Sequence, residues 1–216
     1  MALNVSEIFF SLQGESTFAG LPCVFVRLFG CNLACSWCDT VYARDPAEKS
    51  RSMELAAIME EIEAFGCSLV EITGGEPLLQ KETPLLIKKL LQKKFKVLLE
   101  TNGSLSIAEV PQGCVRIIDI KCPSSRESGR NMYENLELLT QTDQVKFVIA
   151  DGDDYQFARQ VMKRLGHIPG ENIHLSPVSG TTAPEQIARW MLRDRLGARL
   201  SLQLHKIIWN PEKRGV

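Results

Sequence analysis

The chain has 216 residues, of which 44% are hydrophobic and 24% charged, and its formal net charge is −1. That length can bury a sizeable core, so we expect residues 1–216 to form a single domain. The near-neutral charge argues against direct nucleic-acid binding, and no run is long enough for a membrane span. The first residues carry no export signal. The odd count of seven cysteines favours reduced thiols and a cytoplasmic location.

Strand and helix signals alternate along the first half of the chain. Leu55, Ile58 and Ile62 recur at helical spacing, and Gly66 follows as a helix stop. The predicted elements here are strands at residues 5–12, 22–29, 68–73 and 95–100, and helices at residues 52–65 and 84–94. The second strand leads directly into a cysteine-rich loop, and a glycine pair follows the third.

The second half continues the same alternation. Its predicted strands are residues 114–120, 144–149, 172–175 and 199–204, and its predicted helices are residues 131–140, 154–165 and 184–196. Polar or glycine-rich clusters follow successive strands, which is typical of a parallel α/β barrel with its site at the carboxyl ends of the strands. The chain is short for eight full strand–helix units.

Three cysteines lie within eight residues, Cys31, Cys35 and Cys38, with the spacing C-x3-C-x2-C. Such soft ligands suit either zinc or an iron–sulfur cluster. A structural zinc site needs four closed ligands, usually in two pairs, and the sequence has no second CxxC pair. On a cubane of four irons, three thiolates would leave one iron free to bind a small molecule.

This triplet, with Trp37 before its last cysteine, resembles the signature of radical S-adenosylmethionine (SAM) enzymes. In that superfamily SAM chelates the open iron. One electron from the cluster then cleaves SAM to methionine and a 5′-deoxyadenosyl radical. Further matches resemble the 7-carboxy-7-deazaguanine synthase family, and they are residues 12–15, 39–40, 73–77, 203–206 and 213–216. The resemblance therefore runs from one end of the chain to the other.

The resemblance implies a fold and a set of cofactor contacts. The fold is an α/β partial, open parallel (β/α) barrel with some crossover helices shortened. The cofactors are a 4Fe-4S cluster on Cys31, Cys35 and Cys38, SAM, and Mg2+ at Thr40. The implied SAM contacts are Trp37, Cys38, Asp39, Gly75, Glu76, Asp119 and Lys121. The segment Asp119-Ile120-Lys121 departs from the Ser-Pro-Lys of many relatives, which makes Lys121 the safer match.

The resemblance also implies the substrate, a reduced pterin that carries a 6-carboxylate. Its implied contacts are Leu12, Gln13, Gly14, Glu15, Arg27 and Thr73. Glutamine and glutamate suit the polar edge of the pyrimidine ring, and arginine suits the carboxylate. The implied reaction converts 6-carboxy-5,6,7,8-tetrahydropterin to 7-carboxy-7-deazaguanine by radical ring contraction with loss of ammonia. This step belongs to queuosine biosynthesis, a tRNA-modification pathway. A homodimer and an electron donor such as flavodoxin or ferredoxin are also implied.

Two other functions remain open at this point. A radical SAM activase of a glycyl-radical enzyme shares the triplet and the Gly-Gly-Glu-Pro motif but acts on a protein. An iron–sulfur or zinc-binding regulatory module would cleave no SAM. Among the remaining polar residues, we expect His205 and Lys206 to reach the site from the last strand, and we assign His167 and His174 structural or surface roles.

Overall fold

A single sheet organises the protein, whose computed structural model describes residues 1–210 and 213–216. Its nine strands are β1 (Ala2–Leu12), β2 (Pro22–Leu28), β3 (Arg51–Glu54), β4 (Leu69–Gly74), β5 (Lys96–Thr101), β6 (Val115–Ile120), β7 (Gln144–Ile149), β8 (Ile173–Pro177) and β9 (Arg199–Leu200). The strand order is β3-β1-β2-β4-β5-β6-β7-β8-β9. Neighbours from β2 to β9 run parallel, whereas β1 is antiparallel to both β2 and β3.

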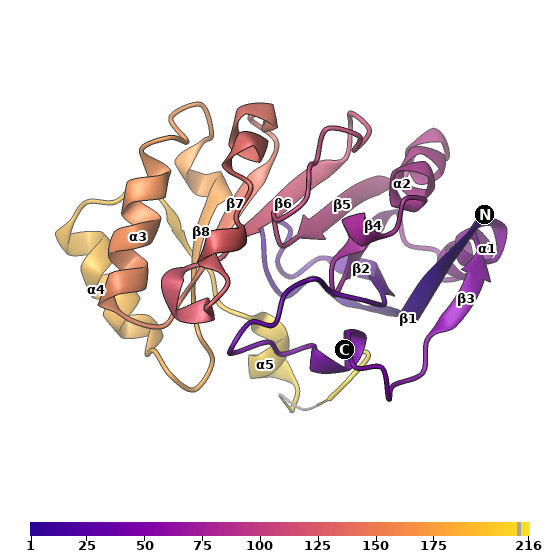
Figure 1. The fold of residues 1–216 in the computed structure, drawn as a ribbon, viewed down its shortest axis with the longest axis horizontal. Coiled ribbons are helices and arrows are strands. Elements are labelled where there is room, and N and C mark those ends of the chain that lie inside the picture. Colours follow the sequence, from indigo (N-terminus) through magenta and orange to yellow (C-terminus); the bar gives the residue numbers. More distant parts are fainter. Residues whose placement is uncertain (211–212) are drawn as a thin grey trace.

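The sheet curves without closing, so β3 and β9 remain its two edges (Figure 1). The α-helices are α1 (Leu55–Ala64), α2 (Thr83–Gln92), α3 (Gly152–Met162), α4 (Pro184–Arg193) and α5 (Leu204–Ile208). In Figure 1, α1 and α2 lie toward β3, and α3 and α4 lie at the opposite end of the molecule. This arrangement confirms the predicted partial, open barrel. Within the described residues, no helix combines the length and apolarity that crossing a membrane requires.

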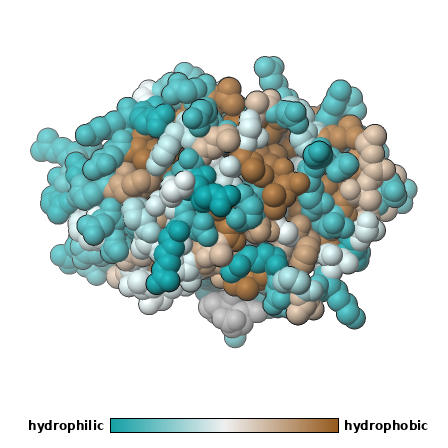
Figure 2. Space-filling view, in the orientation of Figure 1, coloured by the Kyte–Doolittle hydropathy of each residue, from teal (hydrophilic) through white to brown (hydrophobic). Residues whose placement is uncertain are grey.

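The main core lies between the sheet and its helices. Ile72 and Leu99 of neighbouring strands are fully buried against helix residues such as Ile58 and Leu86. Strands that are covered on both faces read as nearly continuous apolar runs, which explains why these segments were recognisable in the sequence. Hydrophilic residues cover the α3 and α4 side of the face in Figure 2, whereas apolar residues gather nearer β4 and β5.

Three predicted elements differ from the structure in part, although the helix expected at residues 52–65 is confirmed over Leu55–Ala64. Residues 51–54 form β3 and not the first turn of a helix, because the outer backbone of β1 needs a hydrogen-bonding partner. Within residues 131–140 the chain forms a 3-10 helix, Tyr133–Leu138. Its Asn135 is buried and bonds to backbone groups of Leu105 and Ile107.

The third difference lies at the end of the chain. Strand β9 stops at Leu200, and Leu204 then begins α5 where the strand was expected to end. The amide of Leu204 donates to the carbonyl of Gly14 at 2.9 Å, so this segment leaves the sheet and packs on the turn after β1.

Five more short 3-10 helices lie in the connections of the described part of the chain. They are η1 (Val41–Ala43), η2 (Pro77–Leu79), η3 (Pro123–Ser125), η4 (Ser128–Arg130) and η6 (Gly170–Asn172), with η5 being Tyr133–Leu138. The β6–β7 crossover contains only η3, η4 and η5, which agrees with the expectation that some crossover helices are shortened.

A buried ion pair between Arg116 and Asp143 stabilises the base of the sheet, and we predict how much stability is lost when it is removed. Asp143 is fully buried and accepts hydrogen bonds from the amide and Nε of Arg116 and from the amide of Thr140. Breaking a buried pair typically costs about 3–5 kcal/mol. Asp143→Ala should therefore lower the free energy of unfolding by about 3 kcal/mol in anaerobic urea titrations.

The matched control is the exposed pair of Glu63 and Lys93. Glu63→Ala should cost less than about 1 kcal/mol, because exposed ion pairs contribute little. Equal losses for the two variants would contradict a special role for Asp143.

Candidate active site

The inward face of the sheet changes from apolar to polar along each strand. Strand side chains alternate between faces, so residues two apart share the interior. A small apolar cluster fills one end, and it consists of Cys23, Phe25, Leu69, Leu98, Val115 and Ile117. Two or four residues later on the same face of these strands come the charged or polar side chains of Arg27, Glu71, Thr73, Glu100 and Asp119, and β7 adds Lys146. The polar layer lies toward the carboxyl ends of the parallel strands.

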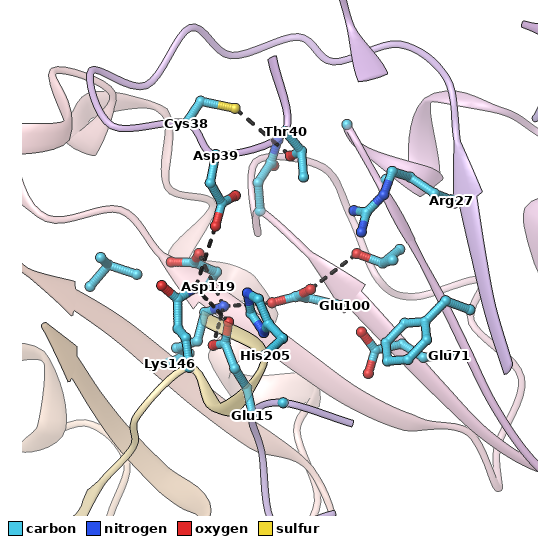
Figure 3. A pocket seen from close by; sticks show the side chains of 18 of the residues that line it. Glu15, Arg27, Cys38, Asp39, Thr40, Glu71, Glu100, Asp119, Lys146 and His205 are labelled. Carbon is cyan, nitrogen blue, oxygen red and sulfur yellow. Dashed lines mark hydrogen bonds and ion pairs between the residues drawn. The ribbon is translucent and has the colours of Figure 1, made fainter. Parts of the chain in front are cut away.

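These polar residues line a cavity of about 730 Å3. Its wall also includes the cysteine loop and residues 203–206 and 213–216, apart from Leu204. All of the predicted site residues line this cavity except Glu76. Figure 3 shows side chains from several strands converging on the cavity, with Arg27 on one side and Asp39 on another. Segments far apart in the sequence therefore contribute to one site.

Backbone packing brings the cysteine loop against the glycine motif. The Gly75 amide donates to the carbonyl of Leu28 at 3.1 Å, and the Glu76 amide donates to the carbonyl of Gly30 at 2.8 Å. A Cβ on Gly75 would lie 2.1 Å from the Gly30 oxygen and 2.8 Å from the Cβ of Cys31. Only glycine fits such a close approach. This contact explains why the two motifs, about a strand and a helix apart in sequence, lie side by side.

The three cysteines of the loop are free and partly buried. Donors surround Cys31, whose Sγ lies 3.4 Å from the Leu33 amide and 3.8 Å from Nδ2 of Asn102. The loop is held from outside by Ser36, which donates to the carbonyls of Ser124 and Ser125. Three thiols on one loop, with N–H donors at Cys31, are a suitable donor set for an iron–sulfur cluster, whose sulfurs commonly accept such bonds.

Glu76 is the one predicted site residue that does not line the cavity. Its carboxylate is fully buried and accepts from the amide of Leu78 at 2.9 Å, the hydroxyl of Thr101 at 2.8 Å and the amide of Asn102 at 2.8 Å. Burial raises the pKa of this carboxyl, although the hydrogen bonds oppose the shift. Thr101 and Asn102 line the cavity themselves. The geometry therefore gives Glu76 the role of ordering the end of β5.

Arg27 is held at the cavity wall by a polar cluster. Its Nε donates to Glu7 at 2.8 Å, and the Tyr42 hydroxyl donates to the same oxygen at 2.7 Å. The guanidinium of Arg214 lies 4.1 Å from the centre of the Tyr42 ring. Only 15% of the Arg27 side chain is exposed. With its Nε engaged, its terminal nitrogens extend toward the cavity (Figure 3), where they can bind an anion.

Helix α5 packs over the turn that follows β1. Gln203 Nε2 donates to Glu15 at 2.8 Å, and Lys206 Nζ donates to Asp39 at 2.8 Å. A Cβ on Gly14 would lie 2.4 Å from Nδ1 of His205, so glycine is needed for this contact. His205 and Lys206 thus reach the site as expected, although they do so from a helix and not from a strand.

Sequence reasoning missed several buried charges at the cavity, above all Glu71, Glu100 and Lys146. Lys146 Nζ donates to Glu15 at 2.9 Å and to Glu100 at 2.6 Å. Thr73 donates to the other oxygen of Glu100 at 3.0 Å. The sequence does carry a signal for these residues, because each charged side chain interrupts an otherwise apolar strand at a position that faces the cavity. A single such charge carries no meaning until the register of neighbouring strands is known.

The pKa values of these groups reflect their burial and their partners. Burial raises the pKa of Glu71 well above its ordinary value, and Gln13 Nε2 donates a hydrogen bond to its carboxyl group. Burial also raises the pKa of Glu100, but Lys146 and Thr73 lower it overall. Burial lowers the pKa of Lys146, whereas Glu100 and Glu15 raise it well above its ordinary value. The site therefore holds fixed charges of both signs.

Of the structural and surface roles that we expected for His174, its burial excludes the surface one. It is buried and lines the cavity, and its Nε2 lies 2.8 Å from Oε1 of Gln144. Among the described residues, Nδ1 has no hydrogen-bond partner. Burial lowers the pKa of His174 to about 4, so the ring is neutral near pH 7. His167 is exposed, as expected.

Known structures share this fold. The crystal structure of QueE from Escherichia coli matches with a TM-score of 0.78 at 23% identity, covering 95% of each chain. Streptococcus suis SuiB bound to S-adenosylmethionine matches with a TM-score of 0.57 at 11% identity, covering 81% of this chain and 48% of that one. At these identities the matches show the fold alone.

Sequence comparisons identify the family as well as the fold. The model of the radical SAM superfamily matches residues 26–118. The chain is 43% identical to the 7-carboxy-7-deazaguanine synthase of Koribacter versatilis, covering 99% of this chain and 100% of that protein. It is 46% identical to the enzyme of that name from Chlorobaculum tepidum, covering 99% and 97%. Identity at this level over the whole length shows that the chain belongs to the 7-carboxy-7-deazaguanine synthase family of radical SAM enzymes.

Proposed function

We propose that this radical SAM enzyme converts 6-carboxy-5,6,7,8-tetrahydropterin to 7-carboxy-7-deazaguanine with loss of ammonia. It would thereby act as a carbon–nitrogen lyase in queuosine biosynthesis. The observation that carries the proposal is that the cysteine triplet, the cation of Arg27 and the polar pair Gln13 and Glu15 line one cavity. A small carboxylated heterocycle needs this combination of a radical source, a cation and ring-edge partners.

The family implies a 4Fe-4S cluster and SAM, and the residues present fit both. Cys31, Cys35 and Cys38 would hold the cluster through their sulfurs. When bound there, the cluster and SAM would supply the radical chemistry that hydrogen abstraction from the substrate requires. The proposed SAM contacts at the cavity are Trp37, Asp39, Gly75, Asp119 and Lys121. The contribution of Glu76 would be indirect, because its carboxylate orders Thr101 and Asn102 instead of facing the cavity.

The proposed substrate contacts divide into a carboxylate end and a ring end. Arg27 would bind the carboxylate with its terminal guanidinium nitrogens, while Glu7 fixes its orientation. Gln13, Glu15 and Thr73 would bind the polar ring edge, with Leu12 and Gly14 shaping the wall. The protein's part is positioning and the exclusion of water by α5 and the C-terminal residues.

We also propose a Mg2+ ion beside the substrate carboxylate, with Thr40 as its protein ligand. The Thr40 hydroxyl lies at the cavity wall, 3.9 Å from the sulfur of Cys38. Magnesium prefers oxygen ligands and is often held by few protein groups together with substrate oxygens. Flavodoxin or ferredoxin as electron donor and a homodimeric assembly complete the proposal.

The cluster assignment predicts a specific loss of iron. Anaerobically reconstituted protein should contain about four irons per chain, and Cys31→Ala should lose most of them, because a cubane needs each of its thiolate ligands. Iron analysis and the visible absorption spectrum measure the difference. Cys67→Ala is the matched control, since Cys67 is partly buried but lies outside the cavity. Stoichiometric zinc without iron in the wild type would overturn the assignment.

Arg27 tests the substrate class. A charged hydrogen bond is typically worth about 1.5–3 kcal/mol, so Arg27→Ala should lower kcat/KM for the pterin by roughly 10- to 100-fold. SAM cleavage without substrate should persist. Chromatography of 7-carboxy-7-deazaguanine and 5′-deoxyadenosine measures both, with the exposed Arg51→Ala as control. Normal pterin turnover by Arg27→Ala, or a radical formed only on a partner polypeptide, would favour the activase.

The magnesium site makes a separate prediction. Chelation of Mg2+ should slow pterin turnover by the wild type, because the carboxylate loses one of its two cations, and should leave uncoupled SAM cleavage largely intact. Thr40→Ala should raise the Mg2+ concentration needed for half-maximal turnover. A metal-independent rate in carefully depleted enzyme would remove Mg2+ from the proposal.

A further inference from the structure

We propose that Lys146 is a positioning residue of the substrate site, which holds Glu15 and Glu100 as a fixed pair of carboxylates facing the pterin ring edge. This inference rests on the proposed function, because it names a further residue that the same substrate would need. No part of the sequence resemblance assigned a role to Lys146.

The geometry gives Lys146 a bridging position. It lies on β7, while Glu15 follows β1 and Glu100 lies on β5, so one ammonium joins three separated parts of the chain. Its Nζ donates to Oε2 of Glu15 at 2.9 Å and to Oε1 of Glu100 at 2.6 Å. Oδ2 of Asp119 lies 3.9 Å from the same nitrogen. Figure 3 shows Glu15, Asp119 and Lys146 close together, with Glu100 beside them.

The remaining contacts lock both carboxylates. The second oxygen of Glu15 accepts from Gln203 at 2.8 Å, and the second oxygen of Glu100 accepts from Thr73 at 3.0 Å. Each oxygen of a carboxylate has two lone pairs, so every one can still accept a bond from a ligand. The amino and ring N–H groups of a pterin edge are donors of the kind that such oxygens bind. Lys146 thus fixes the acceptors without using them up.

Without the ammonium group of Lys146, the carboxylates of Glu15 and Glu100 would lie in a buried site with no cation between them. Side chains of Lys146 and both carboxylates are largely buried, with 10% exposure for Lys146, 17% for Glu15 and 27% for Glu100. The charged and titratable groups that face this cluster from the surrounding elements are Arg27, Asp39, Glu71, Asp119, Lys121, His174, His205 and Lys206. Like charges that share a buried site cannot all ionise, so one carboxyl would take up a proton.

The test compares Lys146→Met and Lys146→Arg with the wild type. Methionine keeps the length of the side chain and removes the charge, whereas arginine keeps the charge. The measurement is the Kd of 6-carboxy-5,6,7,8-tetrahydropterin for the reconstituted protein with SAM, by anaerobic calorimetry from pH 6 to pH 9. Iron content and circular dichroism report on folding, and kcat/KM over the same pH range gives a second readout.

Lys146→Met should weaken binding by about 10- to 100-fold at pH 7. Most of that loss should be recovered at pH 9, because raising the pH removes the extra proton and restores both acceptors. The acidic limb of the kcat/KM profile should move up by at least about one pH unit. Lys146→Arg should keep the limb near its wild-type position.

A second variant covers the case in which Lys146→Met does not fold. The double variant Glu100→Gln/Lys146→Met removes the repulsion between the two carboxylates. It should bind the pterin weakly, and its affinity should not recover at high pH, because the amide of glutamine cannot titrate. A loss that is uniform across pH would indicate a purely structural role and overturn the inference, as would wild-type binding by Lys146→Met. If the wild type binds no pterin at any pH, the proposed function fails first and this inference with it.

Discussion

The site depends on the backbone contact between the turn after β4 and the loop after β2. Gly75 approaches Gly30 and Cys31 so closely that a Cβ would lie 2.1 Å from a carbonyl oxygen. Two amide hydrogen bonds, from Gly75 to Leu28 and from Glu76 to Gly30, hold the loops together. This contact sets the position of the first cysteine relative to the strand ends. A larger residue at Gly75 would separate the cysteine loop from the polar cavity beneath it.

A second layer of organisation comes from buried charge. The inward strand positions carry apolar groups at one end of the sheet and ionisable groups at the other. Burying these charges is costly, and their mutual pairing offsets the cost only in part. What they supply is a preorganised field, since Lys146, Glu100 and Thr73 are fixed by one another before any ligand arrives. The apolar helix-facing side of the same strands provides the stability that such an interior requires.

The C-terminal residues close the site by contacts with the beginning of the chain. Lys206 pairs with Asp39 beside the last cysteine, and Arg214 pairs with Glu48 at 3.0 Å. In Figure 1, α5 and the C-terminus lie beside the loop that follows β2. The cavity is therefore walled by segments from both ends of the sequence. This explains how a short, open barrel can still enclose a small substrate.

The sequence by itself determined the alternating elements, the cysteine triplet and the glycine motif. These are local signals, since an apolar strand such as β7 or a spacing such as that of Cys31, Cys35 and Cys38 needs no distant partner. Only the tertiary structure decided which side chains meet. The bridge made by Lys146 depends on strand register, the burial of the Glu76 carboxylate depends on Thr101 and Asn102, and the path of residues 201–208 depends on the turn at Gly14. Each of these is a contact between residues far apart in the chain, and no local pattern encodes its geometry.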